Sequence, residues 1–234
     1  MAYIFKPASQ PSVQVKGSDD LFPVHRIYCV GQNYRDHTLE MGGDPERELP
    51  FFFCKPADAV VADGAVLAYP LATENLHHEV ELVVALKAGG VNIKAADAES
   101  LIFGYGVGND LTRRDLQKIA KDGRRPWEAG KAFDHAAPVS ALVPMADAEL
   151  SADSKIELSV NGVLCQSGRI GDLIWSVCET ISLLSSLFEL QAGDLIFTGT
   201  PAGVGPLVGG DTAVGSIEGI GSITTNIAVR GTSV

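Results

Sequence analysis

The sequence predicts a mainly β protein with a few short helices, of the α+β class. Its 25 glycines and 12 prolines are spread among short apolar runs, a pattern typical of many strands and turns. The Asn161-Gly162 pair lies between two β-prone runs, which predicts a tight hairpin. With 234 residues, 46% of them apolar, the chain can bury a substantial core. We therefore expect one domain over residues 25–234, preceded by a short N-terminal segment over residues 1–24.

The formal net charge of −11 argues against a nucleic-acid partner or an anionic membrane, because either requires a basic patch. No stretch approaches the roughly 18 apolar residues of a membrane span, and no basic start is followed by a long apolar core. The four cysteines lie far apart without a Cys-x-x-Cys pair, which favours neither a zinc site nor a disulfide framework. We expect a soluble, cytoplasmic protein with reduced thiols and with neither a nucleic-acid nor a membrane partner.

Apolar and β-branched runs bounded by turn residues predict the strands. In the first half they cover residues 12–15, 26–30, 59–61, 66–69, 75–86 and 101–109, with 59–61 and 66–69 paired as a hairpin. In the second half they cover residues 155–160, 163–167, 194–198, 211–217 and 223–229. Helical spacing predicts helices over residues 33–41, 95–100, 111–120 and 174–188. The three successive phenylalanines at residues 51–53 are interpreted as core and wall, and the lysine after them, Lys55, as structural.

Two glutamates begin the most apolar of these strands. Because side chains on a strand alternate between its faces, Glu79 and Glu81 point to the same side, roughly 7 Å apart along the backbone. One interpretation is a half-exposed strand with both glutamates in water. The other is a metal site, since paired carboxylates repel unless a positive charge lies between them. The interior character of the run up to Leu86 favours the second, with Mg²⁺ or Mn²⁺ as the cation.

A third carboxylate, Asp110, follows the strand over residues 101–109. That strand has glycine at every second position from Gly104 to Gly108, so one of its faces is bare and allows a close approach to the backbone. Asp110 could cap the helix that follows it. It could also complete a set of oxygen ligands with Glu79 and Glu81 that leaves open positions for substrate and water.

Three further positions are candidates for catalysis or binding. On the helix over residues 33–41, His37 and Glu40 are three apart and share a face, an arrangement that suits a general base, although a surface pair is the alternative. This helix and the polar segment after it, up to residue 50, could together form a mobile flap. Lys131 could balance an oxyanion or bind a carboxylate, unless it is a solvated loop lysine. The glycine-rich loop over residues 199–205 lacks the Gly-Lys-Ser/Thr of a nucleotide site, and Thr200 offers a small ligand its hydroxyl.

Several motifs together resemble one family. They span residues 25–229 in the following order: Val30-Gly31-Gln32-Asn33-Tyr34 with His37 and Glu40; Phe53-Cys54-Lys55-Pro56; His77-His78-Glu79-Val80-Glu81-Leu82; Gly108-Asn109-Asp110 with Thr112, Arg114, Asp115 and Gln117; Arg125-Pro126-Trp127 with Lys131; and Gly199-Thr200-Pro201-Ala202-Gly203-Val204-Gly205. The chain is similar to members of the fumarylacetoacetate hydrolase family, and in particular to its small acylpyruvate hydrolases.

The resemblance implies a fold, a cofactor and roles for residues. The fold would be the family's mixed β-roll, with the domain over residues 25–234 catalytic and the protein a homodimer. Mg²⁺ or Mn²⁺ would be held by Glu79, Glu81 and Asp110. His37 and Glu40 would lie on a flap that orders over the substrate. The pyruvyl end of the substrate would be contacted by Lys131, Gln117 and Thr200.

The activity that the resemblance implies is hydrolysis of the C3–C4 bond of a 2,4-dioxo acid. Fumarylpyruvate or maleylpyruvate would give pyruvate and a carboxylic acid, as in the gentisate-type degradation of aromatic compounds. Oxaloacetate decarboxylation, isomerisation of a hydroxydienedioate and a non-catalytic binding protein are the alternatives. Two departures from the family, Gln32 for an arginine and Arg113 for a small residue, concern the distal end of the substrate. The candidates to meet a distal carboxylate there are Arg35, Arg47, Arg113, Arg124 and Arg125.

Overall fold

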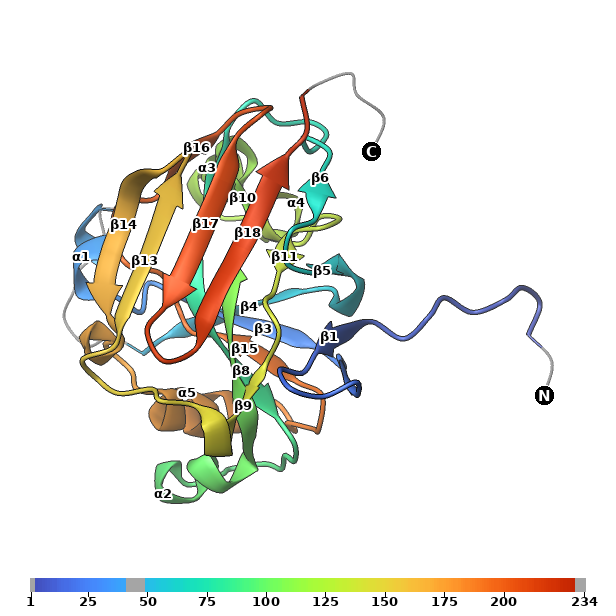
Figure 1. Cartoon of the computed structure of the whole chain (residues 1–234), viewed down its shortest axis with the longest axis vertical. Coiled ribbons are helices and arrows are strands. Elements are labelled where there is room, and N and C mark those ends of the chain that lie inside the picture. The colour runs from blue at the N-terminus through green and yellow to red at the C-terminus, as the bar shows by residue number, and fades with distance from the viewer. Residues whose placement is uncertain (1–2, 41–48, 230–234) are drawn as a thin grey trace.

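The structure is a computed structural model that describes residues 3–40 and 49–229. Its described residues form many strands and a few short helices, which confirms the predicted fold class. Two large sheets face each other, and the helices lie around their edges (Figure 1). Within the described residues, no helix is long and apolar enough to span a membrane.

The larger sheet is mixed and carries the residues of interest. Its order is β12 (Val143–Pro144), β9 (Ile102–Asn109), β8 (Val80–Leu86), β15 (Leu195–Phe197), β3 (Ile27–Gly31) and β4 (Phe51–Lys55). The β15–β3 pair is parallel and the other pairs are antiparallel. Strand β8 is therefore an inner strand, with a neighbour on each side.

The second sheet has five strands and lies in front of the first in Figure 1. Its order is β14 (Val163–Arg169), β13 (Lys155–Val160), β17 (Thr212–Ile217), β18 (Gly221–Ile227) and β6 (Val66–Leu67). The β13–β14 hairpin turns at Asn161 and Gly162, whose φ angles of 51° and 81° are those that a two-residue hairpin turn requires. The hairpin prediction is confirmed.

Three small sheets and the helices complete the fold. The small sheets are β1 (Ser12–Gln14) with β2 (Leu21–Pro23); β10 (Thr112–Arg113), β7 (Leu76–His78) and β16 (Gly205–Leu207); and β11 (Ala137–Pro138) with β5 (Val60–Val61). The α-helices are α1 (Arg35–Glu40), α2 (Ala95–Ala98), α3 (Arg114–Asp122), α4 (Glu128–Lys131) and α5 (Val177–Ser185). Short 3₁₀ turns cover Ala57–Ala59, Glu99–Leu101, Met145–Asp147 and Ile170–Asp172.

Strand β8 is buried on both of its faces. Its side chains point alternately into two different apolar clusters. Val80, Leu82 and Val84 belong to the cluster that also contains Ile156 and Ile223 of the five-stranded sheet. The alternate residues Val83 and Ala85 pack on the other side with Phe22, Ile27 and Phe197. Glu81 shares this second face, because it is two residues before Val83. The interpretation of a half-exposed strand is therefore wrong.

The predicted hairpin of residues 59–61 with 66–69 is wrong. Strand β5 pairs in parallel with β11, and β6 pairs in parallel with β18, so the two segments belong to different sheets. The turn between them is held by β18, since Thr224 N donates to Asp63 Oδ1 and Gly64 N donates to Thr224 O. These long-range bonds replace the local pairing that a hairpin would need.

Helix bounds also differ from the predictions. Helix α3 begins at Arg114 because the two preceding residues form β10, which pairs with β7. Helix α5 covers only Val177–Ser185, and it begins at a capping box in which Ser176 and Glu179 bond each other's backbone. The short helix α4 was not predicted. The glycines after the helix over residues 33–41 lie outside the described residues.

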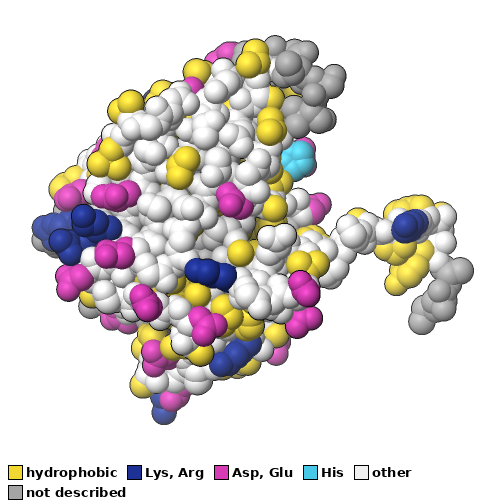
Figure 2. Space-filling model, viewed as in Figure 1, with side chains coloured by type: hydrophobic (Ala, Val, Ile, Leu, Met, Phe, Trp, Pro, Cys, Tyr) yellow, Lys and Arg dark blue, Asp and Glu magenta, His cyan; other side chains and the backbone are white. Residues whose placement is uncertain are grey.

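The surface reflects the net charge. In Figure 2, acidic side chains are scattered over the visible face, whereas lysine and arginine occur in a few small groups. An extended N-terminal arm projects from the body (Figure 1), and its Tyr3, Ile4 and Phe5 are fully or largely exposed.

The glycines of β9 allow other segments of the protein to pack closely against this strand. A Cβ atom at Gly104 would lie 2.1 Å from the carbonyl oxygen of Val143 on β12, and one at Gly108 would lie 2.5 Å from the ring of Phe197. A Cβ atom at Gly106 would meet only side chains, the nearest being Leu142 at 3.1 Å. The face of β9 that was predicted to be bare is therefore covered by Val143 of β12, by Leu142 just before it, and by Phe197 of β15.

We expect Gly104→Ala to destabilise the protein by about 2–3 kcal/mol, because its methyl group would overlap a backbone oxygen that cannot rotate away. Gly106→Ala is the matched control on the same face of the same strand, and it should cost about 1 kcal/mol or less. Denaturant unfolding of both variants measures the two free energies. Equal losses would contradict this account of the packing.

Candidate active site

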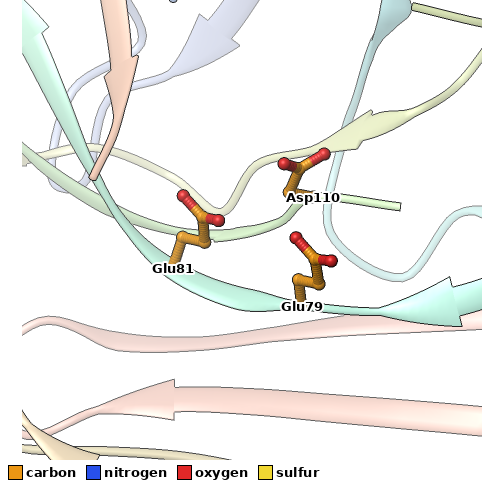
Figure 3. A group of neighbouring side chains, drawn as sticks. All are labelled: Glu79, Glu81 and Asp110. Carbon is orange, nitrogen blue, oxygen red and sulfur yellow. The ribbon is translucent and has the colours of Figure 1, made fainter. Parts of the chain in front are cut away.

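The three predicted carboxylates meet at the ends of two adjacent strands (Figure 3). Glu79 lies between β7 and β8, Glu81 lies on β8, and Asp110 follows β9 directly. Strands β8 and β9 are antiparallel with Glu81 opposite Gly108, so the start of one strand lies beside the end of the other. Each side chain is buried, and each offers one oxygen within 4.8 Å of the others.

Backbone contacts fix this meeting of strand ends. Asp110 N donates to Glu79 O at 2.8 Å, and Glu79 N donates to Asn109 Oδ1 at 3.0 Å. The Asn109 side chain also donates to Thr225 Oγ1 of β18, which ties the site to the second sheet. Asp110 does not cap α3, because the N-cap residue of that helix is Arg113, which makes no side-chain capping bond. The capping alternative is therefore wrong.

Among the residues that the structure describes, three cationic side chains contact the carboxylates. The Lys131 ammonium lies 2.7 Å from both Glu79 Oε2 and Asp110 Oδ2. The Lys55 ammonium lies 2.7 Å from Asp110 Oδ1, and Arg114 bonds Glu79 Oε1. Both lysines are buried, so the alternative of a solvated loop lysine at position 131 is wrong.

These charges act unequally on the three carboxylates. Burial opposes ionisation of Glu79, but Lys131 and Arg114 outweigh it and hold the pKa of that carboxyl well below its usual range. Burial also opposes the charge of Lys131, and Asp110 with Glu79 outweighs it, so the pKa of that lysine is raised. Burial raises the pKa of Glu81 well above its usual range, and the charges of Asp110 and Glu79 raise it further. Among the described residues, no ion pair reaches Glu81.

The donor set fits a hard divalent cation. All three candidate ligands are carboxylates, which Mg²⁺ and Mn²⁺ prefer. Asp110 Oδ1 is buried and has an ion-pair partner, yet it receives no hydrogen bond from the described residues. Glu81 accepts one bond, from Gly199 N at 2.7 Å. Glu81 forms no ion pair with a cationic side chain among the described residues. A cation bound by the three carboxylates would supply this positive charge.

The three carboxylates line one pocket. It is lined by Val30, Gly31, Gln32, His37, Phe51, Phe53, Glu79, Glu81, Asp110, Arg114, Gln117, Lys121, Trp127, Lys131 and Thr200. Of the eight side chains predicted for catalysis, substrate binding or metal binding, seven are in this set, and the eighth, Glu40, contacts His37. The structure thus brings the predicted residues together.

The predicted pair of His37 and Glu40 is formed. His37 Nδ1 lies 3.2 Å from Glu40 Oε2, and the Glu40 carboxylate also accepts Gly203 N, at 3.2 Å. Because an ionised carboxylate can only accept, Nδ1 carries the hydrogen and Nε2 is left with its lone pair. His37 is buried, so the alternative of a surface pair is wrong for the imidazole. Residues 41–48 of the predicted flap lie outside the described residues.

Two predicted binding residues are held by neighbours. Gln117 Oε1 accepts a bond from Arg114 at 2.6 Å, and Thr200 Oγ1 accepts one from Gln166 at 2.7 Å. Both Gln117 and Thr200 are buried in the pocket wall.

Sequence reasoning missed two of the cationic partners. Lys55 was interpreted only as structural and Arg114 only as part of a motif, yet each forms an ion pair with one of the three carboxylates. A lone lysine at the end of the phenylalanine run of β4 was the available signal for Lys55. Arg114 comes four residues after Asp110, a spacing that would place the two side chains on one face of a helix. Strand β10 lies between them, so this spacing could not predict their contact.

Of the arginines suggested for the distal carboxylate, the four that the structure describes do not line the pocket: Arg35, Arg113, Arg124 and Arg125. Arg113 instead stacks 4.3 Å above the ring of Phe133, and Arg47 lies outside the described residues. The pocket is lined by Gln32, whose φ of 56° is unusual for a residue other than glycine.

The fold and this arrangement of acidic, basic and histidine side chains define a metal-dependent enzyme. Residues 26–228 match the family model described as fumarylacetoacetate hydrolase, C-terminal, and the chain belongs to that family.

Three relatives with named activities are similar to the chain over most of its length. A crystal structure of fumarylpyruvate hydrolase from Pseudomonas aeruginosa, in complex with Mn²⁺ and pyruvate, is 49% identical, covers 98% of this chain and 100% of that one, and has a TM-score of 0.95. A fumarylpyruvate hydrolase of Ralstonia is 44% identical over 79% of this chain and 95% of its own length. An oxaloacetate tautomerase of Escherichia coli is 41% identical over 88% of this chain and 94% of its own length.

We expect Mn²⁺ to raise the thermal unfolding midpoint of the protein, since a ligand that binds only the native state stabilises it. Glu81→Gln keeps the side-chain shape and removes one ligand charge, so the affinity for Mn²⁺ should fall by about 100-fold. Calorimetric titration measures the affinity directly. Glu157→Gln on β13, outside the pocket, is the control and should bind as the wild type does. An unchanged affinity in Glu81→Gln would contradict the assignment of this ligand.

Proposed function

We propose that the protein hydrolyses the C3–C4 bond of an acylpyruvate to pyruvate and a carboxylic acid, with Mg²⁺ or Mn²⁺ as its cofactor. The observation that carries this proposal is one pocket in which three buried carboxylates converge beside a His37–Glu40 pair. It is supported by the 49% identity to a fumarylpyruvate hydrolase that was crystallised with Mn²⁺ and pyruvate.

Glu79, Glu81 and Asp110 would hold the cation. When bound, the cation would supply positive charge to the pyruvyl end of the substrate, where negative charge gathers as the C3–C4 bond breaks. Lys131 and Arg114 keep Glu79 ionised, because they hold its pKa low despite its burial. The same Lys131, with Gln117 and Thr200, would line the part of the pocket that receives the pyruvyl end.

His37 is the proposed general base. Its Nε2 accepts a proton from water while the water oxygen bonds to C4 of the substrate. The C3–C4 bond then breaks, its electron pair stays with the pyruvyl fragment, and a proton delivered to C3 completes pyruvate. Glu40 accepts a hydrogen bond from Nδ1–H and stabilises the imidazolium that forms.

His37→Asn should lower kcat for fumarylpyruvate by about 10²–10⁴-fold, because it removes the base and leaves the three carboxylates in place. Pyruvate release measures the rate, and Mn²⁺ affinity should stay within about twofold of the wild type. His135→Asn is the matched control: His135 is exposed, lies outside the pocket and has a φ of 62°, which asparagine tolerates. A His37 variant with wild-type turnover would contradict the assigned base.

A second candidate function is a reaction on oxaloacetate, which is favoured by the 41% identity to an oxaloacetate tautomerase. Decarboxylation or tautomerisation of oxaloacetate, or isomerisation of a hydroxydienedioate, would use the same charges and would not need water as a nucleophile. The His37→Asn variant separates the two functions when it is assayed on both substrates. Loss of fumarylpyruvate hydrolysis with retained turnover of oxaloacetate favours hydrolysis as the role of His37.

The acyl group is proposed to carry a carboxylate, as fumaryl and maleyl groups do. Helix α3 places Gln117 and Lys121 one turn apart, with Gln117 buried in the pocket and Lys121 exposed at its edge. Phe51 and Trp127, whose rings meet edge to face with centroids 5.1 Å apart, give the same pocket an apolar wall. An unsaturated acyl chain could lie along this wall and present its distal carboxylate to Lys121.

Lys121→Met should raise KM for fumarylpyruvate about three- to fivefold, since an exposed ion pair contributes up to about 1 kcal/mol. KM for acetylpyruvate, which has no distal carboxylate, should not change. Lys118→Met is the control, because Lys118 lies on the same helix, pairs with Asp122 and is outside the pocket. An equal rise in KM for both substrates would contradict a contact with the distal carboxylate.

The finer expectations stay predictions: a homodimer, a cytoplasmic location, maleylpyruvate as a substrate and a place in gentisate-type degradation. A single domain over residues 25–234 also stays a prediction.

A further inference from the structure

Gln166 lies outside the pocket and donates a hydrogen bond to the hydroxyl group of Thr200, a residue that lines it. Gln166 lies on β14 of the second sheet, is 0% exposed, and is not among the residues that line the pocket. Its Nε2 donates to Thr200 Oγ1 at 2.7 Å and to the carbonyl oxygen of Pro201 at 2.8 Å. Its Oε1 accepts from His78 Nδ1 at 2.9 Å and from Val80 N at 3.1 Å.

Two backbone groups fix which way the amide of Gln166 points. Val80 N can only donate and Pro201 O can only accept, so Oε1 must face the first and Nε2 the second. All the usual hydrogen-bonding positions of this amide are then occupied by the described residues. Because Oε1 can only accept, His78 Nδ1 carries a hydrogen.

The direction of the Thr200 hydroxyl follows from these bonds. Its oxygen accepts the N–H of Gln166, so its own hydrogen must be donated elsewhere. Among the described residues, Thr200 Oγ1 donates to no protein acceptor. Thr200 is 2% exposed and lines the same pocket as Glu81 and Asp110. The hydroxyl hydrogen is therefore available to a molecule bound in the pocket.

We infer that Gln166 is a positioning residue that makes the Thr200 hydroxyl a hydrogen-bond donor to a carboxylate or oxo oxygen of the pyruvyl end. The pyruvyl end of an acylpyruvate offers only acceptors at this position, so a hydroxyl fixed as a donor is complementary to it. The inference rests on the proposed function for the place of the pyruvyl end. It goes beyond that function because it assigns a role in substrate binding to Gln166, a residue of the second sheet.

A double-mutant cycle on pyruvate affinity tests this inference. The variants are Gln166→Met, Thr200→Val and the double variant, and the readout is the Kd of pyruvate for the Mn²⁺-loaded protein by calorimetric titration. Each single variant should weaken pyruvate binding about five- to tenfold, the usual effect of one hydrogen bond to a charged group. The double variant should match Thr200→Val within about twofold, because Gln166 has nothing to orient once the hydroxyl is gone.

Two further variants make the cycle specific. Thr200→Ser keeps the hydroxyl, so Gln166→Met should weaken binding on that background as it does in the wild type. Gln166→Glu keeps an acceptor for His78 and Val80 N and removes the donating amide, and it serves for the same cycle where Gln166→Met does not fold. The unfolding midpoint of each variant is recorded separately.

The outcomes separate this inference from the proposed function. Losses that multiply in the double variant mean that Gln166 acts on the fold in general, and they overturn the inference. Wild-type affinity in Thr200→Val overturns it as well, because the hydroxyl then donates nothing to pyruvate. A coupled cycle in a protein that hydrolyses no acylpyruvate would support the inference and contradict the proposed hydrolysis.

Discussion

The burial of three carboxylates at one point is the constraint that organises this protein. Like charges removed from water repel strongly, and each carries a desolvation cost that only nearby positive charge offsets. The chain supplies that charge from three separate places: Lys55 at the end of β4, Arg114 at the start of α3 and Lys131 at the end of α4. The edge strand and the two helices are thereby tied to the ends of β8 and β9.

This constraint accounts for local features that packing alone does not require. Lys55 is buried behind a run of phenylalanines, where its ammonium also donates to the carbonyl oxygens of Leu111 and Lys131. A Cβ atom at Gly130 would lie 2.9 Å from the backbone of Gln117, so glycine allows α4 to lie directly against α3. That close contact places Lys131 and Gln117 in the same pocket. Glu81, which no ion pair reaches among the described residues, marks where a cation is needed.

Local patterns in the sequence were enough to predict the parts of the site that lie on single strands. The alternation predicted for residues 75–86 correctly placed Glu79 and Glu81 together, and Asp110, which follows β9, lies near them. The Asn161-Gly162 turn was predictable because its backbone angles are set by those two residues. Lys55, Arg114 and Gln166 could not be assigned in this way, since their roles come from contacts between segments far apart in the chain. The same limit explains the incorrect hairpin, where Thr224 of β18 holds the turn at Asp63.

The most direct test is the anomalous scattering of a crystal grown with Mn²⁺. The account predicts one strong peak in the pocket, at about 2.0–2.2 Å from an oxygen of each of Glu79, Glu81 and Asp110. In that crystal the ammonium group of Lys131 should still lie beside Glu79. The two groups have opposite charges, and they attract each other whether or not the metal ion is bound. A pocket without a peak, or a peak held by other side chains while these three carboxylates keep only their lysine and arginine partners, would contradict the account.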